Sequence, residues 1–336
     1  MPVALRSIPF LLCAALSAAP SQAASAVQKV REEALAFGEL KVSRFSLAGE
    51  NGAPVRYYLS QPAAKAPLVL FIQGSGCIPP FLKLDTPQRL STVFNWLPLA
   101  QQGKYAVMVV DKPYQPSAMP EDHPGAAIGC PQAFNDHFSY DSWLATLRSA
   151  VRHALVQPTV DAGRVLVIGV SEGGTMAAGL ARALPEITNV ALIGASGPTQ
   201  LYDFAVDIYG GKDDDAAKAR RLEKLDATFS RIQADPASTS KFAWGHTYLR
   251  WSSFMAQSSA HNLAQSRARV YLASGMRDSA VPILSTELMY AQLRAQGRDV
   301  RFRRVPLADH GLVPEGGTYA QVQPEYDAIM DWFAGR

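Results

Sequence analysis

The chain has 336 residues, of which 48% are apolar, and its 32 basic and 29 acidic residues give a formal net charge of +3. A chain of this length and composition can bury a large core. The charge is weak and forms no basic stripe, so nucleic-acid binding is not indicated, and no later apolar run is long enough to cross a membrane.

The first 23 residues have the pattern of a removable export signal. Arg6 and the amino terminus form a positive region, and the apolar run 8–16 that follows is too short to span a bilayer. Ser21-Gln22-Ala23 then supplies small residues at the two positions that a cleavage site requires. A buried N-terminal helix is the alternative interpretation. We expect a mature chain of residues 24–336, exported to the periplasm or secreted.

The next segments predict one helix and then an antiparallel hairpin. Residues 27–37 have apolar side chains at helical spacing, which predicts an amphipathic helix. Residues 40–47 and 54–60 alternate apolar and polar side chains around Asn51-Gly52, a pattern typical of two antiparallel strands joined by a turn.

After position 67 the pattern becomes one of buried strands separated by helices. Continuous apolar runs, as in strands covered on both faces, occupy 68–72, 106–110, 165–168, 190–193 and 270–272, and residues 300–305 are predicted to form another strand. Helical patterns lie between or after them, at 86–102, 140–156, 175–184, 282–296 and 325–333. This alternation predicts an α/β fold with a doubly wound, mostly parallel sheet.

Residues 199–263 interrupt the alternation and carry no strand signal. They contain a charged helix-like stretch at 213–231 and an aromatic-rich stretch at 241–255, which together predict a helical cap inserted over the site. The aromatic side chains of the cap either line a substrate pocket, with Trp244 and Tyr248 as candidates, or pack the cap onto the sheet.

The most informative motif is Gly169-Val170-Ser171-Glu172-Gly173. It follows the apolar run 164–168 and precedes a run of small residues with helical character at 174–184. Strand, sharp turn and helix are the context of a nucleophile elbow, in which a strained turn exposes the serine hydroxyl. The sequence therefore predicts Ser171 as a nucleophile.

An activated serine needs a histidine base and an acid that orients the base. Asp278 follows the predicted strand at 270–272, and His310 follows the predicted strand at 300–305. Both positions lie just past strands, where active-site groups gather in open α/β sheets. Asp309 is a poor orienting acid because neighbouring side chains point apart.

With these residues the chain resembles the α/β-hydrolase family. The matching stretches are 169–174 for the elbow, 275–282 for the acid loop and 309–311 for the histidine loop, and the extra Gly174 is similar to the elbow of prolyl-oligopeptidase-type and dienelactone-hydrolase-type members. The resemblance implies the α/β-hydrolase fold and a triad of Ser171, His310 and Asp278. Such a triad needs no cofactor, and no histidine pair has metal-ligand spacing.

Acyl transfer also needs donors for the developing oxyanion. One is the backbone N–H of Glu172, next to the nucleophile. The other comes from the loop 73–77, which takes the place of the family's His-Gly-Gly-type loop with Gln73 in the histidine position; Ser75 is the expected donor and Gly76 the alternative. The Glu172 side chain is either solvated at the helix start or in contact with substrate. Gln73 and Tyr114 are further candidates for substrate contact.

The mature chain would retain two cysteines, Cys77 and Cys130. An even count in an exported protein favours a disulfide, with two free thiols as the alternative. We expect an exported serine hydrolase that cleaves a small-molecule carboxylic ester through an acyl-enzyme. A serine peptidase is the nearest alternative, and a non-catalytic binding protein on the same scaffold is another; the oligomeric state is left open.

Overall fold

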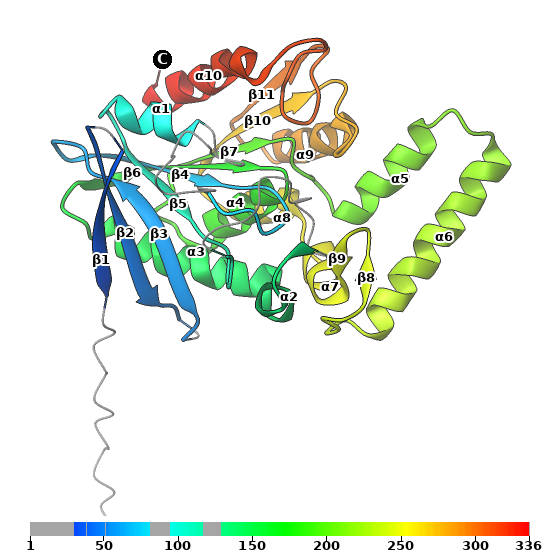
Figure 1. Ribbon diagram of the computed structural model, residues 1–336. Coiled ribbons are helices and arrows are strands. Elements are labelled where there is room, and N and C mark those ends of the chain that lie inside the picture. The colour runs from blue at the N-terminus through cyan, green and yellow to red at the C-terminus, as the bar shows by residue number, and fades with distance from the viewer. Residues whose placement is uncertain (1–29, 38, 51, 81–94, 117–128, 336) are drawn as a thin grey trace, which may run out of the picture.

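The computed structural model describes residues 30–37, 39–50, 52–80, 95–116 and 129–335. The predicted export signal lies outside these residues. The described residues form a nine-stranded sheet whose order is β1-β2-β3-β5-β4-β6-β7-β10-β11 (Figure 1). In that order the strands are Arg31–Phe37, Leu40–Ala48, Pro54–Ser60, Ala106–Val110, Ala66–Ile72, Val160–Val170, Asn189–Ile193, Arg269–Gly275 and Val300–Val305.

The sheet has an antiparallel part and a parallel part. Strands β1, β2, β3 and β5 pair antiparallel in succession. From β5 through β4, β6, β7 and β10 to β11 every pairing is parallel. The predicted mostly parallel sheet is confirmed, and the predicted antiparallel hairpin corresponds to β2 and β3.

Helices cover both faces of the parallel part. The α-helices of the described residues are α1 to α10, at Trp96–Gln101, Gln132–His137, Tyr140–Leu155, Glu172–Ala183, Gln200–Gly210, Asp215–Ala234, Tyr248–Met255, Ser259–Ala264, Ile283–Ala295 and Gln323–Ala334, and not all of them lie on the sheet. Helices α3, α4, α8 and α9 contribute to one hydrophobic cluster with alternate strand residues such as Leu70, and α1 and α10 contribute to the other with Phe71. Alternation of side chains along each buried strand thus supplies two cores.

One predicted element is wrong. Residues 31–37 form the edge strand β1 rather than a helix, and all seven pair with β2. The segment is rich in alanine and glutamate, which favour helix. The strand is held by its ladder to β2 and by cross-strand contacts from Ser43 to Glu32 and from Arg44 to Glu33, so pairing decides its conformation.

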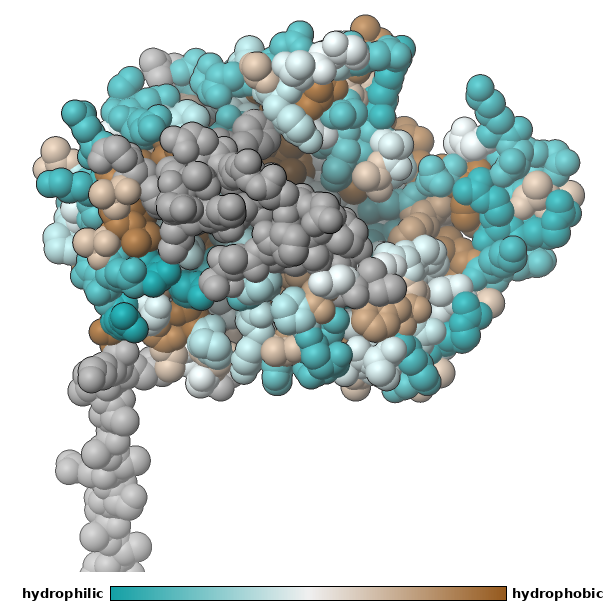
Figure 2. Space-filling view, viewed as in Figure 1, coloured by the Kyte–Doolittle hydropathy of each residue, from teal (hydrophilic) through white to brown (hydrophobic). Residues whose placement is uncertain are grey.

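The segment between β7 and β10 extends to one side of the sheet (Figure 1). It contains α5, α6, α7 and α8, together with a short two-stranded sheet of β8 (Phe242–Ala243) and β9 (His246–Thr247) that the sequence did not predict. Its own hydrophobic cluster includes Ile208, Phe229, Tyr248 and Trp251. In Figure 2 its outward side is hydrophilic, and apolar atoms lie on the side toward the body of the molecule. We call residues 199–263 the cap segment.

Candidate active site

Ser171 lies on a strained turn between β6 and α4. Its backbone has φ 56° and ψ −124°, a conformation that side chains other than glycine rarely adopt. A Cβ on Gly169 would lie 2.2 Å from the Gly173 carbonyl oxygen, and a Cβ on Gly173 would lie 2.3 Å from that of Ile72. Glycine at both positions therefore lets strand, helix and the neighbouring loop meet at the serine, as the elbow motif predicts.

Asp278 and His310 form a hydrogen-bonded pair beyond the ends of β10 and β11. His310 Nδ1 lies 2.8 Å from Asp278 Oδ2. The other carboxylate oxygen, Oδ1, accepts hydrogen bonds from the backbone N–H groups of Ala280 at 2.9 Å and Val281 at 2.8 Å. The aspartate side chain is fully buried, so both of its oxygens are fixed and its orientation toward the imidazole is set.

The end of β7 lies between Ser171 and this pair. The Ile193 carbonyl accepts a hydrogen bond from the Ser171 N–H at 2.8 Å. The next residue, Gly194, has φ 54°, and a Cβ there would lie 3.1 Å from His310 Nδ1. Among the described residues, Ser171 and His310 share no hydrogen bond.

Ser171 opens into a cavity of about 370 Å³ between the sheet edge and the cap segment. Ser75 and Glu172 also line it. From the cap segment, both polar and aromatic side chains line it: Gln200, Asp203, Phe204, Asp207, Trp244, His246, Arg250 and Trp251. The turn at Ser171, the loop 73–77 and the cap segment thus all line the same cavity.

The four substrate-contact candidates have different surroundings. Trp244 lines the cavity, whereas Gln73, Tyr114 and Tyr248 are not among the described residues that line it. Tyr248 packs inside the cap segment. Tyr114, with φ 55°, stacks on His137 with the ring centroids 4.1 Å apart.

Gln73 is a buried part of the loop's support. Its Nε2 donates to Gln115 Oε1 at 3.1 Å, and the same oxygen accepts the Lys112 N–H at 2.7 Å. Gln115 Nε2 in turn donates to the Ile78 carbonyl. One glutamine thus joins both ends of the loop 73–78 to the segment after β5.

A buried lysine lies behind the same loop. Lys112 Nζ donates to the carbonyl oxygens of Gly74 at 2.6 Å and Gly76 at 2.8 Å, and it lies 3.2 Å from Glu172 Oε1. The side chain is fully buried, with the ammonium over the rings of Phe138 and Trp143 at 4.9 Å and 4.3 Å. Burial lowers the pKa of Lys112 to about 8, although Glu172 opposes the shift.

The Glu172 side chain is not solvated, which corrects one of the two expectations for it. Only 1% of the side chain is exposed, and Arg250 from α7 donates to Oε2 through Nε at 2.8 Å and also through Nη2. Burial alone would raise the pKa of Glu172, but Arg250 and Lys112 outweigh burial and lower it to about 2. The carboxylate therefore stays ionised between two cations, beneath the cap segment.

Sequence reasoning missed Lys112 and Arg250, since lysine and arginine are rarely buried and neither lies in a motif. It also gave no role to His246, which is buried in the cavity wall. Burial, together with the nearby Arg250, lowers the pKa of His246 to about 4, so its imidazole is neutral at physiological pH.

The predicted disulfide is present. Cys77 and Cys130 are bonded, with their Cα atoms 6.0 Å apart and 53 residues of separation. The bond ties the far end of the loop 73–77 to the segment before α2. Among the described residues, no group of histidine, cysteine, aspartate or glutamate is arranged to hold a metal ion. No helix in the same residues is long and apolar enough to cross a membrane.

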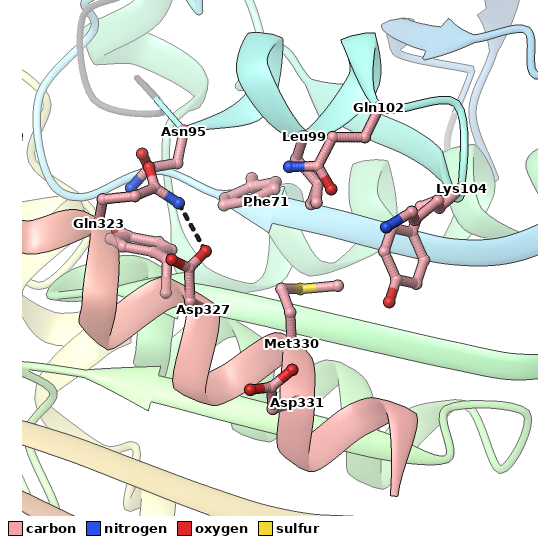
Figure 3. A pocket seen from close by; sticks show the side chains of 11 residues that line it. Phe71, Asn95, Leu99, Gln102, Lys104, Gln323, Asp327, Met330 and Asp331 are labelled. Atoms are coloured by element: carbon pink, nitrogen blue, oxygen red, sulfur yellow. Dashed lines mark hydrogen bonds between the residues drawn. The ribbon is translucent and has the colours of Figure 1, made fainter. Parts of the chain in front are cut away.

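A second cavity, of about 310 Å³, lies between α1 and α10 (Figure 3). Leu99, Phe71 and Met330 form its apolar part, and Gln323 donates a hydrogen bond to Asp327 at 2.9 Å on its rim. None of the predicted site residues lines it, so it is separate from the cavity at Ser171.

Comparisons with known proteins agree with this architecture. Residues 228–335 match the model of the prolyl oligopeptidase family. An acetyl xylan esterase from a Paenibacillus species is 14% identical with a TM-score of 0.59, over 92% of this chain and 89% of that one. The α/β hydrolase GrgF from a Penicillium species is 9% identical with a TM-score of 0.57, over 88% and 99%.

A third solved structure is matched only in part. The acylaminoacyl peptidase of Pyrococcus horikoshii is 12% identical with a TM-score of 0.54, over 91% of this chain but 41% of that one. Among curated proteins no match was found.

Proposed function

The chain has the α/β-hydrolase fold, and from that premise we propose that it is an exported serine hydrolase that cleaves carboxylic esters. The observation that carries the proposal is Ser171 in its strained turn, open to a cavity, with the hydrogen-bonded Asp278–His310 pair on the other side of the end of β7. These three residues come from three separate loops, and their chain order is that of a hydrolase triad.

In the proposed mechanism each residue has one task. Ser171 attacks the ester carbonyl, and His310 accepts its proton and then protonates the leaving alkoxide. Asp278 holds the imidazole in the required tautomer and stabilises the imidazolium. The backbone N–H groups of Ser75 and Glu172 stabilise the oxyanion, and water then resolves the acyl-enzyme.

An ester is favoured over a peptide by the size of the site. The cavity at Ser171 is about 370 Å³, which is near the lower end of ligand pockets and suits a small acyl or alcohol group. Peptidase activity is the second candidate, because the C-terminal third of the chain matches the prolyl oligopeptidase family. The matched peptidase structure is more than twice as long as the part that this chain covers.

Labelling of the purified protein with a fluorophosphonate probe tests the nucleophile. The wild-type protein should be labelled and the Ser171→Ala variant should not. Ser279→Ala is the matched control, since Ser279 is an exposed serine that lines the same cavity. Labelling that survives in Ser171→Ala, or that is lost only in Ser279→Ala, would reject Ser171 as the nucleophile.

A substrate panel separates the two candidate activities. We expect hydrolysis of p-nitrophenyl esters with short acyl groups and little turnover of aminoacyl naphthylamides. The reverse preference would establish the peptidase. Absence of both activities, together with absence of labelling, would favour a binding protein on a hydrolase scaffold.

Export is supported by the signal-like pattern of residues 1–23 and by the Cys77–Cys130 disulfide, a bond that persists in oxidising compartments. N-terminal sequencing of periplasmic or secreted material should place the mature terminus near Ala24. Recovery of intact Met1 from a cytosolic fraction would contradict this part of the proposal.

A further inference from the structure

We propose that Lys112 is a positioning residue of the oxyanion hole, which holds the backbone N–H of Ser75 toward the carbonyl that Ser171 attacks. The inference rests on the proposed function, because an oxyanion hole has a task only if acyl transfer occurs. Lys112 lies far from the triad residues in sequence, and stabilisation of the transition state would depend on it.

The geometry of the peptide plane carries the argument. In a trans peptide the C=O of one residue and the N–H of the next point in opposite directions. The described chain contains no cis peptide, and the Gly74 carbonyl points to Lys112 Nζ at 2.6 Å. The N–H of Ser75 must therefore point away from Lys112.

The side opposite Lys112 is the side of the nucleophile. Ser75 lines the cavity into which Ser171 opens, and a Cβ built on Gly74 would lie 3.4 Å from the Ser171 Cβ. The Gly76 carbonyl also accepts from Lys112, at 2.8 Å, so the Gly74–Ser75 peptide and the Gly76–Cys77 peptide are both held by the same ammonium group. An oxyanion donor is effective only when it is oriented before the reaction begins.

The ammonium group suits this task by its donor count. It has three N–H donors, and three oxygens surround it: those of Gly74, Gly76 and Glu172. A neutral amine has two donors, so loss of the proton leaves one buried oxygen without its hydrogen bond, which is unfavourable. The loop orientation should therefore depend on the charge of Lys112.

Charged groups from several elements face the ammonium. Glu172 at the start of α4 attracts it, while Arg250 from α7 repels it, and His246 from β9 is neutral at physiological pH. Phe138 and Trp143 cover it with their rings. Burial sets the pKa of Lys112 at about 8, so the proton is lost within an accessible range. Its neighbour Asp111 is turned away and pairs with Arg56.

The first test is the pH dependence of wild-type ester hydrolysis, from about pH 6 to about pH 10. We expect kcat to fall as the pH rises through about 8, because Lys112 loses its proton there. KM should change little, because the donor acts mainly on the transition state. A kcat that stays level throughout this range would overturn the proposal without any variant having to fold.

The second test uses Lys112→Met, which keeps the length and apolar stem of the side chain but removes the donors. We expect kcat to fall about 100-fold, as when one oxyanion donor is removed, with KM within about threefold of wild type. The alkaline decrease should disappear. Inhibition by a boronic acid, which forms a tetrahedral anion on serine, should weaken in the same proportion, while inhibition by the product carboxylate should not.

Arg298→Met is the matched control. Arg298 also holds a loop by its carbonyl oxygens, donating to those of Leu263, Ser266 and Ala268, but it lies away from the cavity. This variant should lose stability while keeping the wild-type kcat and pH profile. Equal losses of kcat in both variants, or an unchanged kcat in Lys112→Met, would overturn the proposal. Absence of ester hydrolysis in the wild-type protein would instead reject the proposed function.

Discussion

Replacement of Arg250 by methionine should destabilise the protein strongly, because it leaves Glu172 with one cation instead of two. Arg250 contacts Glu172 through Nε and Nη2, donates to Gln200 Oε1 at 3.0 Å, and stacks 4.1 Å from the Trp251 ring. Methionine retains the apolar contact with the ring and loses every charged contact. Lys112, at 3.2 Å from Oε1, remains as the single counter-charge.

The loss of free energy of unfolding in Arg250→Met can be obtained in two ways. Removal of one partner from a buried ion pair costs about 3–5 kcal/mol. Independently, the pKa of Glu172 is lowered from 4.5 to about 2, a net shift that corresponds to about 3 kcal/mol in favour of the carboxylate after Arg250 and Lys112 have offset the effect of burial. Since Lys112 remains, we expect a loss at the lower end of this range, about 3 kcal/mol at neutral pH.

The assay is urea unfolding followed by tryptophan fluorescence, at neutral pH and again near pH 3. A carboxylate whose folded pKa is depressed stabilises the fold above its unfolded pKa of 4.5, and this contribution is lost as the pH falls toward 2. In Arg250→Met the pKa of Glu172 rises, so less stability remains to be lost in acid. The difference between wild type and variant should therefore shrink below about pH 4.

Arg221→Met is the control, because Arg221 also forms ion pairs within the cap segment, at 2.8 Å to Asp213 and 3.4 Å to Asp207, but is exposed. Its loss should cost less than about 1 kcal/mol. If the two variants are destabilised equally, or if the deficit of Arg250→Met persists unchanged in acid, the reasoning about the buried carboxylate is refuted.

Three further predictions concern the site and its support. Asp278→Asn should lower kcat by about 10⁴ with little change in KM, because an amide favours the wrong tautomer of His310, and steady-state kinetics that show less than a tenfold loss would point to another acid. Gly194→Val should lower both kcat and melting temperature, because its φ of 54° disfavours a branched side chain whose Cβ would crowd His310, and unchanged values would show that the turn relaxes. Cys130→Ser should lower the unfolding free energy by about 4 kcal/mol, as expected for a loop with 53 residues of separation, and urea denaturation that gives the wild-type midpoint would refute this.

The parallel sheet could be predicted from the sequence because most of its strands are buried on both faces. The apolar run at 106–110 coincides with the bounds of β5, and the run at 190–193 lies within β7; every residue of both strands is buried. In such a run every position is apolar because both faces of the strand are covered. The turn at Ser171 could be predicted for a related reason, since Gly169 and Gly173 occupy positions where no side chain fits.

The edge strand β1 could not be predicted from the sequence in the same way. It pairs on one side only, with β2, and several of its side chains are exposed, so its composition carries no burial signal. Its alanine and glutamate residues favour a helix in isolation. The conformation is decided by a partner strand, which local sequence does not encode.

The charged network behind the site was also beyond sequence reasoning. Glu172 lies 60 residues from Lys112 and 78 residues from Arg250, and each comes from a different loop or helix. Which side of a cap helix faces the cavity is equally a matter of packing. Tyr248 and Trp251 are both buried residues of α7, but only Trp251 lines the cavity.

The pairing of Arg250 with Glu172 limits how the cap segment can be exchanged. A cap grafted from another protein would remove the only α7 cation from a carboxylate that stays at the nucleophile elbow. The grafted cap would then cover a buried Glu172 carboxylate that has Lys112 as its single counter-charge, however stable the graft is by itself. Transplants that carry an arginine at the position of Arg250, or that replace Glu172 and Lys112 together with apolar residues, should be the ones that fold with the rest of the protein.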